Sequence, residues 1–370
     1  MKSREFIEKI LNFADIKVNG DRPFDIQVKN DKFYDRVMAK GTLGFGESYM
    51  DGWWECEQLD EMISRVLKSQ NSNVIFKNLT NVFHILRSKI LNLQTELKSK
   101  KVAREHYDLG NDMYMAFLDP YNQYTCGYFK ATKDLNVAQE QKLDLICKKL
   151  QLKSSDRVLD IGCGWGGFAK YASEHYGCHV TGISISDEQI KYARDFTKGL
   201  PADIIKTDYR DLTGTYDKIL ICGMIEHVGY KNYRKIFEIV KKRLSKDGIF
   251  LLHTIGRNKS GTIVEPWTEK YIFPNSMLPS IQQIAKASED LFIMEDWHSF
   301  GQYYDPTLIA WWKNFDKAWK EFDGKYGERF YRMFRYYLLS CAGAFRARNI
   351  QLWQVVFSAN GIGEEYKSVR

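Results

Sequence analysis

The stretch Arg157–Gly167, RVLDIGCGWGG, joins a short apolar run to a cluster of glycines. Val158, Leu159 and Ile161 form a β-favouring run that is typical of a parallel strand buried on both faces. The glycines allow the backbone to turn sharply and to come close to a ligand; they are Gly162, Gly164, Gly166 and Gly167. The stretch therefore predicts a buried strand, a tight turn and a helix whose first amides face a bound group.

Folds that bind nucleotides, dinucleotides and S-adenosylmethionine (SAM) all use such a loop. A Walker loop requires Lys and then Ser or Thr after the last glycine, but Phe-Ala-Lys follows Gly167. A dinucleotide site requires an acid at the end of the next strand. We expect that strand at 179–185, and it ends without an acid. SAM carries a positive charge and no phosphate, so it fits the acid before the loop, Asp160. We favour SAM, with a dinucleotide second and a purely structural turn third.

Length and composition indicate a two-domain globular protein. The chain has 370 residues, of which 44% are hydrophobic and 27% charged, and a net charge of +7. This surplus suits anionic phospholipid or nucleic acid, but the basic blocks outside Lys98–Arg104 are too short to favour nucleic acid. We therefore expect no nucleic-acid partner.

Cysteine usage and apolar runs indicate a cytoplasmic protein. The seven cysteines form no CxxC pair, which favours reduced thiols and indicates no zinc or other metal site. The N-terminal segment carries charges throughout and lacks the apolar core of a signal peptide. The longest apolar runs, such as Ile219–Ile225, are too short to span a bilayer. Any membrane contact is expected to be peripheral.

The first 75 or so residues predict a small mixed α+β domain. We expect a helix at Ser3–Asp15, extended pieces at 16–18 and 24–28, and a glycine-rich turn at Gly41–Gly46. Adjacent Trp53 and Trp54 cannot both be buried on one face of a regular element. We expect one in the core and the other covering it, with contact to lipid as the alternative.

The middle of the chain changes from helical to alternating patterns. Residues 76–97 predict a long amphipathic helix with a basic face, either joining two domains or lying on an anionic membrane. Residues 105–129 are rich in aromatic and turn-forming residues and indicate a lid around a site. A helix at 137–150 precedes an α/β pattern, with strands expected at 157–161, 179–184, 203–206, 217–223 and 248–254. Residues 280–357 predict further helices and strands of high aromatic density.

Several motifs together carry a resemblance to a known family. They are YMDGWWE, HYDLGND, LDIGCGWGG, IEHVG, LLHTIG, YIFPN, EDWH and CAGAFRARNIQLWQVVFS. Over essentially its whole length the chain resembles the bacterial cyclopropane-fatty-acyl-phospholipid synthases. The resemblance implies an α/β fold, with a Rossmann-like SAM-dependent methyltransferase domain at 91–370 and a lipid-binding domain at 1–90. It also implies a homodimer that transfers a methylene from SAM to the cis double bond of unsaturated phospholipids.

The reaction sets its own demands on the site. An isolated alkene is a weak nucleophile without an acidic proton, so the enzyme must align it with the SAM methyl in a dry site. The resulting carbocation needs aromatic faces and a base that does not capture it. The candidates for an aromatic wall are Tyr107, Tyr124, Tyr128, Phe129, Tyr303 and Tyr304.

The resemblance implies that the base is a bound bicarbonate ion. It places around that ion the residues Cys126, Glu226, His253, Ile255 and Tyr304. From sequence alone, Glu226 also fits a strand-end acid and His253 a strand histidine. Cys341 lies in a motif in which the family's active-site cysteine is traditionally placed. We expect it to be a buried thiol, because no step needs a covalent intermediate.

Resemblance to the mycolic-acid cyclopropane synthases places further residues around SAM. They are Tyr124, Thr125, Leu159, Asp160, the four glycines of the loop, Ser184, Ile185, Gln189, Asp208, Tyr209 and Arg210. Gln189 is our hypothesis for the group that binds the ribose hydroxyls.

Three other functions stay open at this point. The first is SAM-dependent methylation of another lipid alkene, giving a branched acyl chain. The second is a non-catalytic lipid-binding protein with a SAM fold. A nucleic-acid methyltransferase is least favoured, because the string nearest to its Asn-Pro-Pro-Tyr motif is FPNS at 273–276.

Overall fold

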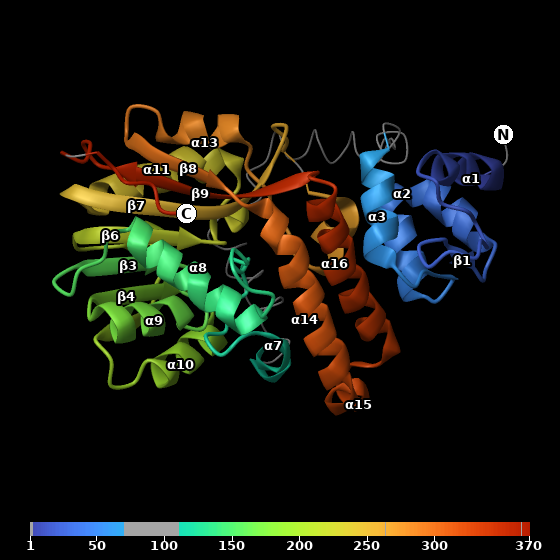
Figure 1. Cartoon of the computed structure of the whole chain (residues 1–370), viewed down its shortest axis with the longest axis horizontal. Coiled ribbons are helices and arrows are strands. Elements are labelled where there is room, and N and C mark those ends of the chain that lie inside the picture. The colour runs from blue at the N-terminus through green and yellow to red at the C-terminus, as the bar shows by residue number, and fades with distance from the viewer. Residues whose placement is uncertain (1–2, 70–110, 263, 364) are drawn as a thin grey trace. The chain divides into compact units, whose positions relative to one another are not determined.

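The computed structural model describes residues 3–69, 111–262, 264–363 and 365–370 (Figure 1). The expected helix at 76–97, the basic residues 98–104 and Tyr107 lie outside the described residues. Contacts divide the chain into two compact units. The first consists of the described parts of 1–92, 262–275 and 304–350, and the second of those of 93–261, 276–303 and 351–370.

The first unit includes two segments that the sequence assigned to the domain at 91–370. Its helices are α1 (Ser3–Phe13), α2 (Lys32–Met50), α3 (Leu59–Lys68), α12 (Pro266–Tyr271), α14 (Tyr304–Ala318), α15 (Asp323–Tyr326) and α16 (Glu328–Arg346). The late segments join this unit because α16 packs against α2 and α3. Arg346 of α16 fixes the contact through ion pairs to Asp60 and Glu61. The boundary expected at residue 90 lies outside the described residues and stays a prediction.

Glycines shape α2 in a way that the sequence analysis predicted wrongly. We expected a turn at Gly41–Gly46, but the helix continues through this stretch, with a break only at Gly41, where φ is +57°. A Cβ on Gly46 would lie 2.4 Å from Cδ1 of Trp267. The glycine at position 46 therefore serves close packing against Trp267 and not chain reversal.

The two adjacent tryptophans have different surroundings, as predicted. Trp54 is fully buried in the short strand β2 (Trp54–Glu55), which pairs antiparallel with β1 (Gln27–Val28). Its indole N–H donates to the carbonyl of Phe45 over 3.1 Å. Trp53 is half-buried beneath the guanidinium of Arg36, which lies 3.5 Å from the ring centroid.

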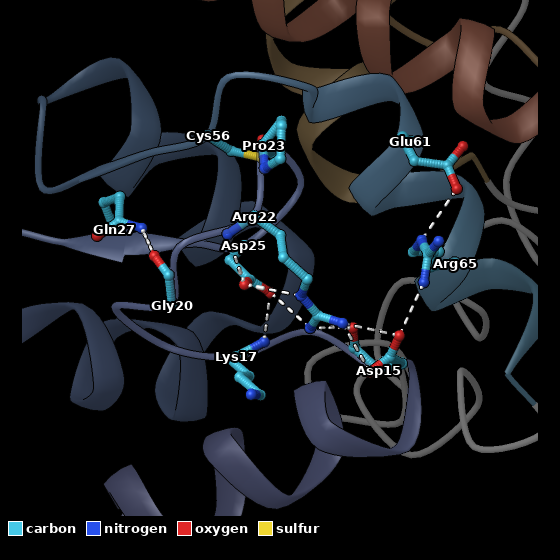
Figure 2. Close-up of polar contacts among 10 residues, drawn as sticks. All are labelled: Asp15, Lys17, Gly20, Arg22, Pro23, Asp25, Gln27, Cys56, Glu61 and Arg65. Carbon is cyan, nitrogen blue, oxygen red and sulfur yellow. Dashed lines mark hydrogen bonds and ion pairs between the residues drawn. The ribbon is translucent and has the colours of Figure 1, made fainter.

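Charged contacts fix the loop before β1 (Figure 2). The buried carboxylate of Asp25 accepts from the backbone amides of Lys17 and Arg22 and from the Arg22 guanidinium. Arg22 also reaches Asp15, which is paired a second time with Arg65 of α3. These contacts hold the pKa of the Asp25 carboxyl at about 2, chiefly through Arg22. The acids and arginines of this cluster pair with one another, so we interpret the cluster as structural.

A seven-stranded sheet forms the centre of the second unit (Figure 1), with strand order β5-β4-β3-β6-β7-β9-β8. The strands are β3 (Arg157–Ile161), β4 (His179–Ser184), β5 (Ala202–Lys206), β6 (Tyr216–Cys222), β7 (Leu244–Arg257), β8 (Ile293–Ser299) and β9 (Ile350–Ser358). Strands β3 to β7 pair in parallel, whereas β8 and β9 pair antiparallel. The five expected strands are confirmed, and β7 is longer at both ends.

Helices cover both faces of this sheet (Figure 1). One face carries α8 (Leu135–Lys149), α9 (Gly167–Tyr176) and α10 (Asp187–Phe196), which pack on Val158, Val180 and Leu251 in one apolar core. On the other face, Phe237 of α11 (Tyr233–Arg243) packs against Phe250 and Phe357. The remaining helices are α7 (Asn111–Phe117) and α13 (Ile281–Ser288). Strands buried on both faces explain the continuous apolar runs in the sequence. Within the described part of the chain, no helix has the length and apolar character needed to cross a bilayer.

Gly167 tests how tightly the start of α9 is packed. A Cβ at this position would lie 1.8 Å from the carbonyl oxygen of Tyr121. We expect Gly167→Ala to lower the stability of the protein by about 1–3 kcal/mol, because the backbone of the neighbouring segment must move. The melting temperature of the full chain measures this.

Gly324→Ala is the matched control. Gly324 is also helical, and nothing lies within 4 Å of its Cβ position. This variant should be neutral or more stable than the wild type. Equal melting temperatures for the two variants would contradict the packing argument.

Candidate active site

The glycine loop begins where β3 ends, and three of its glycines have left-handed backbone conformations. The φ angle is +87° at Gly162, +55° at Gly164 and +82° at Gly166, where other residues are strained. Among the residues that the structure describes, nothing lies within 4 Å of the position of a Cβ on Gly164. Gly166 is the N-cap of α9, so the first amides of that helix follow the loop directly. The loop therefore leaves room for a ligand beside its backbone.

Other predicted cofactor residues follow β4, which pairs with β3, and β5, which pairs with β4. Ser184 ends β4, and its hydroxyl donates to Oε1 of Gln189 over 3.1 Å, with Ile185 between them in the chain. After β5, the carboxylate of Asp208 accepts from the backbone amide and the guanidinium of Arg210, each over 2.9 Å. Because β3, β4 and β5 are parallel neighbours, their carboxyl ends meet at one edge of the sheet. The fold thus brings these residues to the edge that carries the glycine loop.

Side chains of α8 fix the segment that carries Tyr124, Thr125 and Cys126. The amide of Gln139 donates to the carbonyl of Thr125 over 2.8 Å. The ammonium of Lys142 donates to the hydroxyl of Thr125 over 2.9 Å and also to Oε1 of Gln123. The segment is therefore held by two buried side chains from one helix.

The same segment lies against the loop that follows β6. A Cβ on Gly223 would lie 2.8 Å from Cγ2 of Thr125, so only glycine fits there without displacement. Cys126 is fully buried, whereas the ring of Tyr124 packs against Tyr114 of α7. The segment therefore includes two predicted cofactor residues, Tyr124 and Thr125, and one residue predicted to hold the anion, Cys126.

Glu226 lies in the short 3-10 helix η2 (Ile225–His227), which follows β6, and is nearly fully buried. Its Oε1 accepts from the backbone amide of Ile255 over 2.8 Å, while Oε2 has no hydrogen-bond partner among the described residues. Burial raises the pKa of the Glu226 carboxyl to about 7. Near neutral pH this carboxyl is therefore often protonated, and Oε2 can then donate a hydrogen bond.

His253 lies on β7 beside Cys222 of β6 and is also nearly fully buried. Burial, followed by the charges of Lys142 and Lys149, lowers the pKa of His253 well below its usual value, so the imidazole is neutral. Its Nδ1 lies 3.2 Å from the amide nitrogen of Gln354, and no described residue hydrogen-bonds to its Nε2. The end of β7 thus presents a second buried polar atom that a ligand can satisfy.

Asp160, just before the glycine loop, and Lys142 of α8 are both buried. The charge of each stabilises the charge of the other, but not enough to offset burial. Burial raises the pKa of the Asp160 carboxyl to about 7, against the opposing charge of Lys142. Burial likewise lowers the pKa of the Lys142 ammonium. A cation bound near Asp160 would therefore find a carboxyl that ionises readily in its presence.

Part of the predicted aromatic wall is assembled in the second unit. Tyr303 packs edge-on against Tyr128, with ring centroids 5.3 Å apart, and also contacts Phe129. Phe300 links this group to His253, with ring centroids 6.0 Å apart. Tyr124 belongs instead to the cluster around Tyr114. Phe300 therefore lies between His253 and the rings of Tyr128 and Tyr303, and Phe129 contacts Tyr303.

Two predicted site residues belong to the first unit. Tyr304 begins α14 and packs against Phe345, with ring centroids 4.4 Å apart. Cys341 lies in α16, and burial raises the pKa of its thiol to about 12. A protonated thiol supports our interpretation of Cys341 as structural. The role of Tyr304 in the site stays a prediction.

Sequence reasoning missed Lys142, Gln139 and Gln354. A signal was present for Lys142, because it falls on the same helical stripe as Leu135, Ala138 and Leu145, all buried. A lysine on an apolar stripe indicates a buried cation with dedicated partners. Gln354 stands out similarly, as an amide within the apolar run of β9.

Together these groups suit an electrophilic cofactor beside a small oxyanion. The carboxyl of Glu226, which follows β6, is partly protonated near neutral pH, and the imidazole of His253, within the neighbouring strand β7, is neutral. They provide no strong nucleophile that would compete for an electrophile. Within the described ranges, no group of His, Cys, Asp and Glu residues is placed to hold a metal ion.

Comparisons with known proteins identify the family. Residues 94–355 match the family described as mycolic acid cyclopropane synthetase. The chain is 52% identical over 350 residues to the cyclopropane-fatty-acyl-phospholipid synthase of Escherichia coli (strain K12), covering 95% of this chain and 92% of that one. The chain belongs to the mycolic acid cyclopropane synthetase family. The predictions of family, fold class and an enzyme of the SAM-dependent methyltransferase class are confirmed.

Two further relatives in this family are more distant. A probable fatty acid methyltransferase of Pseudomonas putida is 36% identical, covering 68% of this chain and 67% of that one. The crystal structure of the mycolic acid cyclopropane synthase CmaA1 complexed with SAH and CTAB is 28% identical, with a TM-score of 0.66. That similarity covers 70% of this chain and 98% of CmaA1.

The pKa of Glu226 makes a prediction about stability. The pKa of the Glu226 carboxyl is about 7 in the folded protein, above its ordinary value of 4.5. The protonated carboxyl therefore favours the folded state at low pH, and this contribution to stability is lost as pH rises through 7. In Glu226→Gln the side chain at this position has no charge, so the variant does not lose stability through ionisation there. Between pH 5 and pH 8 the stability of this variant relative to the wild type should rise by about 2 kcal/mol.

Melting temperatures of both proteins at the two pH values measure the effect. Glu328→Gln is the control, because the Glu328 side chain is exposed. The same pH-dependent gain in the control, or none in Glu226→Gln, would contradict the buried carboxyl.

Proposed function

We propose that this protein transfers a methylene group, derived from the methyl of SAM, to the cis double bond of an unsaturated acyl chain in a phospholipid. The product is a cyclopropane fatty acyl chain. The observation that carries the proposal is the pair of buried atoms, Oε2 of Glu226 and Nε2 of His253, that lack partners among the described residues. Support also comes from the 52% identity to the Escherichia coli synthase over nearly the full length of both chains.

The residues around the glycine loop fit SAM. When bound, SAM supplies an electrophilic methyl group on a positively charged sulfur. The open side of Gly164 gives its backbone room for a ligand, and Asp160 provides a carboxyl that a cation would ionise. Asp208, which follows β5, and Gln189, in the first turn of α10 after β4, offer polar groups to the adenosine part. The complex of CmaA1 with SAH, the demethylated form of SAM, supports this assignment.

The chain's own residues have three tasks toward the alkene. They must align it with the methyl donor, keep water away from the carbocation and hold the base that accepts one proton. The rings of Tyr128, Phe129 and Tyr303 provide apolar surface and negative ring faces that stabilise a cation. Burial raises the pKa of both acids to about 7 and keeps the histidine neutral, so fewer ionised groups are present to capture the carbocation.

The anion predicted from the family resemblance fits the two partnerless atoms. A bound bicarbonate would supply the base. Glu226, when protonated, and His253, as a neutral imidazole, would each donate a hydrogen bond to it. The charge of buried Lys142, which also acts on His253, favours a negative ion nearby. Cys126, Ile255 and Tyr304 remain predicted members of this site.

Access to the substrate is also part of the proposal. The net charge of +7 suits the anionic surface of a membrane, so we infer peripheral association with the inner membrane from the cytoplasmic side. The N-terminal part of the chain would then contact lipid. A homodimer is expected from the family resemblance.

A second candidate is methylation of a lipid alkene without ring closure. The named activity of the Pseudomonas putida relative, a probable fatty acid methyltransferase, motivates it. Addition of a hydride in place of proton loss, supplied by a separate reductant such as a reduced nicotinamide, would give a methyl-branched acyl chain. That product is heavier than the cyclopropane by two hydrogens.

The direct experiment mixes the purified protein with SAM and vesicles of unsaturated phospholipid. Mass spectrometry of the acyl chains should show the gain of one CH₂ and the loss of the double bond. A gain of CH₂ plus two hydrogens, in a parallel reaction with a reduced nicotinamide added as the hydride donor, would support the branched product instead. If SAM binds but no lipid changes, the substrate assignment is wrong, and the lipid-binding alternative gains support.

Asp160 predicts a pH dependence of SAM affinity. The pKa of its carboxyl is about 7 in the free protein, and a bound cation favours the ionised form. Affinity should therefore rise as pH increases through 7, by up to about tenfold between pH 6 and pH 8. Asp160→Asn should bind SAM more weakly and lose this dependence.

Titration calorimetry across that range measures the affinity. Protonation of SAM itself affects both proteins equally. Asp203→Asn is the control, because Asp203 is exposed on β5. An unchanged slope in Asp160→Asn would show that another group is responsible.

A further inference from the structure

Gln354 is buried on β9 between the two strands that carry His253 and His298. Its side chain is completely shielded from solvent. The amide nitrogen lies 3.2 Å from Nδ1 of His253 on β7, and the residue is in register with His298 on β8. Its Oε1 has no hydrogen-bond partner in the part of the chain that the structure describes. The side-chain amide of Gln354 therefore makes one polar contact among the described residues, and that contact is with His253.

The chemistry of a neutral imidazole gives this contact a consequence. Such a ring has one N–H donor and one acceptor nitrogen, and the partner of one nitrogen determines the state of the other. An amide nitrogen can only donate. Nδ1 must therefore accept, and the ring proton must lie on Nε2.

Burial of His253 and the charges around it keep the imidazole neutral, so only its two neutral tautomers compete. The charges of Lys142 and Lys149 act on the ring and oppose a second proton on it. Lys149 itself is buried and contacts Nδ1 of His298 over 3.0 Å, which places a cation on the same side of the sheet as Gln354. The ring is thus held neutral, and the choice between its two tautomers is left to the amide.

We propose that Gln354 is a positioning residue that holds His253 in the tautomer with its proton on Nε2, so that this atom donates to the anion of the site. The rotated amide would present Oε1 to Nδ1 and move the proton to that nitrogen. Nε2 would then be an acceptor and would repel an anion. Gln354 acts through His253 and need not touch the anion. The part of the inference that concerns the anion rests on the proposed function.

Nitrogen NMR of the full-length protein with ¹⁵N-labelled histidine tests the tautomer without any substrate. His253→Gln identifies the His253 signals by their loss. In the wild type, Nε2 should resonate as a protonated nitrogen and Nδ1 as an acceptor that receives a hydrogen bond. In Gln354→Met, which keeps the bulk but has no donor, the Nδ1 signal should move to the position of an acceptor without a donor. Gln354→Glu should shift the proton to Nδ1.

The second readout is the bicarbonate dependence of turnover on vesicles. Loss of an oriented donor to an ion should raise the bicarbonate concentration for half-maximal rate about tenfold or more in Gln354→Met. Gln351→Met is the matched control. Gln351 is a buried glutamine of the same strand, but it donates to Asn258 and should leave both readouts unchanged.

Two results would overturn the inference. One is a wild-type spectrum with the proton on Nδ1. The other is a Gln354→Met protein with unchanged His253 signals and unchanged bicarbonate dependence. If the wild type itself does not modify lipid, the proposed function fails, and the NMR spectra alone decide whether Gln354 sets the tautomer.

Discussion

Burial of polar groups at the carboxyl edge of the sheet is the constraint on which the rest of the site depends. Glu226, His253, Asp160 and Lys142 are all almost completely shielded from solvent. Burial disfavours charge, so it raises the pKa of both acids to about 7 and keeps the histidine neutral. The site is therefore polar but carries little charge. The glutamines at positions 139 and 354 contribute hydrogen bonds to it without adding charge.

This electrostatic state matches what alkyl transfer to an alkene demands. Under the proposed function, the most reactive species is a carbocation, which water or an ionised nucleophile would capture. A site of neutral donors and aromatic rings can hold an anionic base while offering few competing nucleophiles. The fold thus limits side reactions by controlling ionisation, in addition to positioning groups.

The sequence predicted the elements whose signals are local. The glycine loop and the five parallel strands follow from apolar runs and from residues that tolerate positive φ, and these were confirmed. The turn expected at Gly41–Gly46 was wrong because glycine also serves close helix packing, and the sequence does not show that Trp267 lies against Gly46. The grouping of 304–350 with the first unit likewise depends on contacts between distant segments.

The site was predicted only in part for the same reason. Motifs indicated Glu226 and His253, but their ionisation depends on burial, which motif spacing does not reveal. Lys142 and Gln354 lie in ordinary helix and strand patterns. Their importance becomes visible only when their partners, Thr125 and His253, are placed beside them.

The central claim is that Glu226 and His253 together bind one small oxyanion. Binding of ¹³C-labelled bicarbonate, followed by the broadening of its NMR signal as protein is added, tests this most directly. The account predicts saturable binding to the wild type that is lost in His253→Leu, a variant without a donor at that position. No binding to the wild type, or equal binding to both proteins, would contradict it.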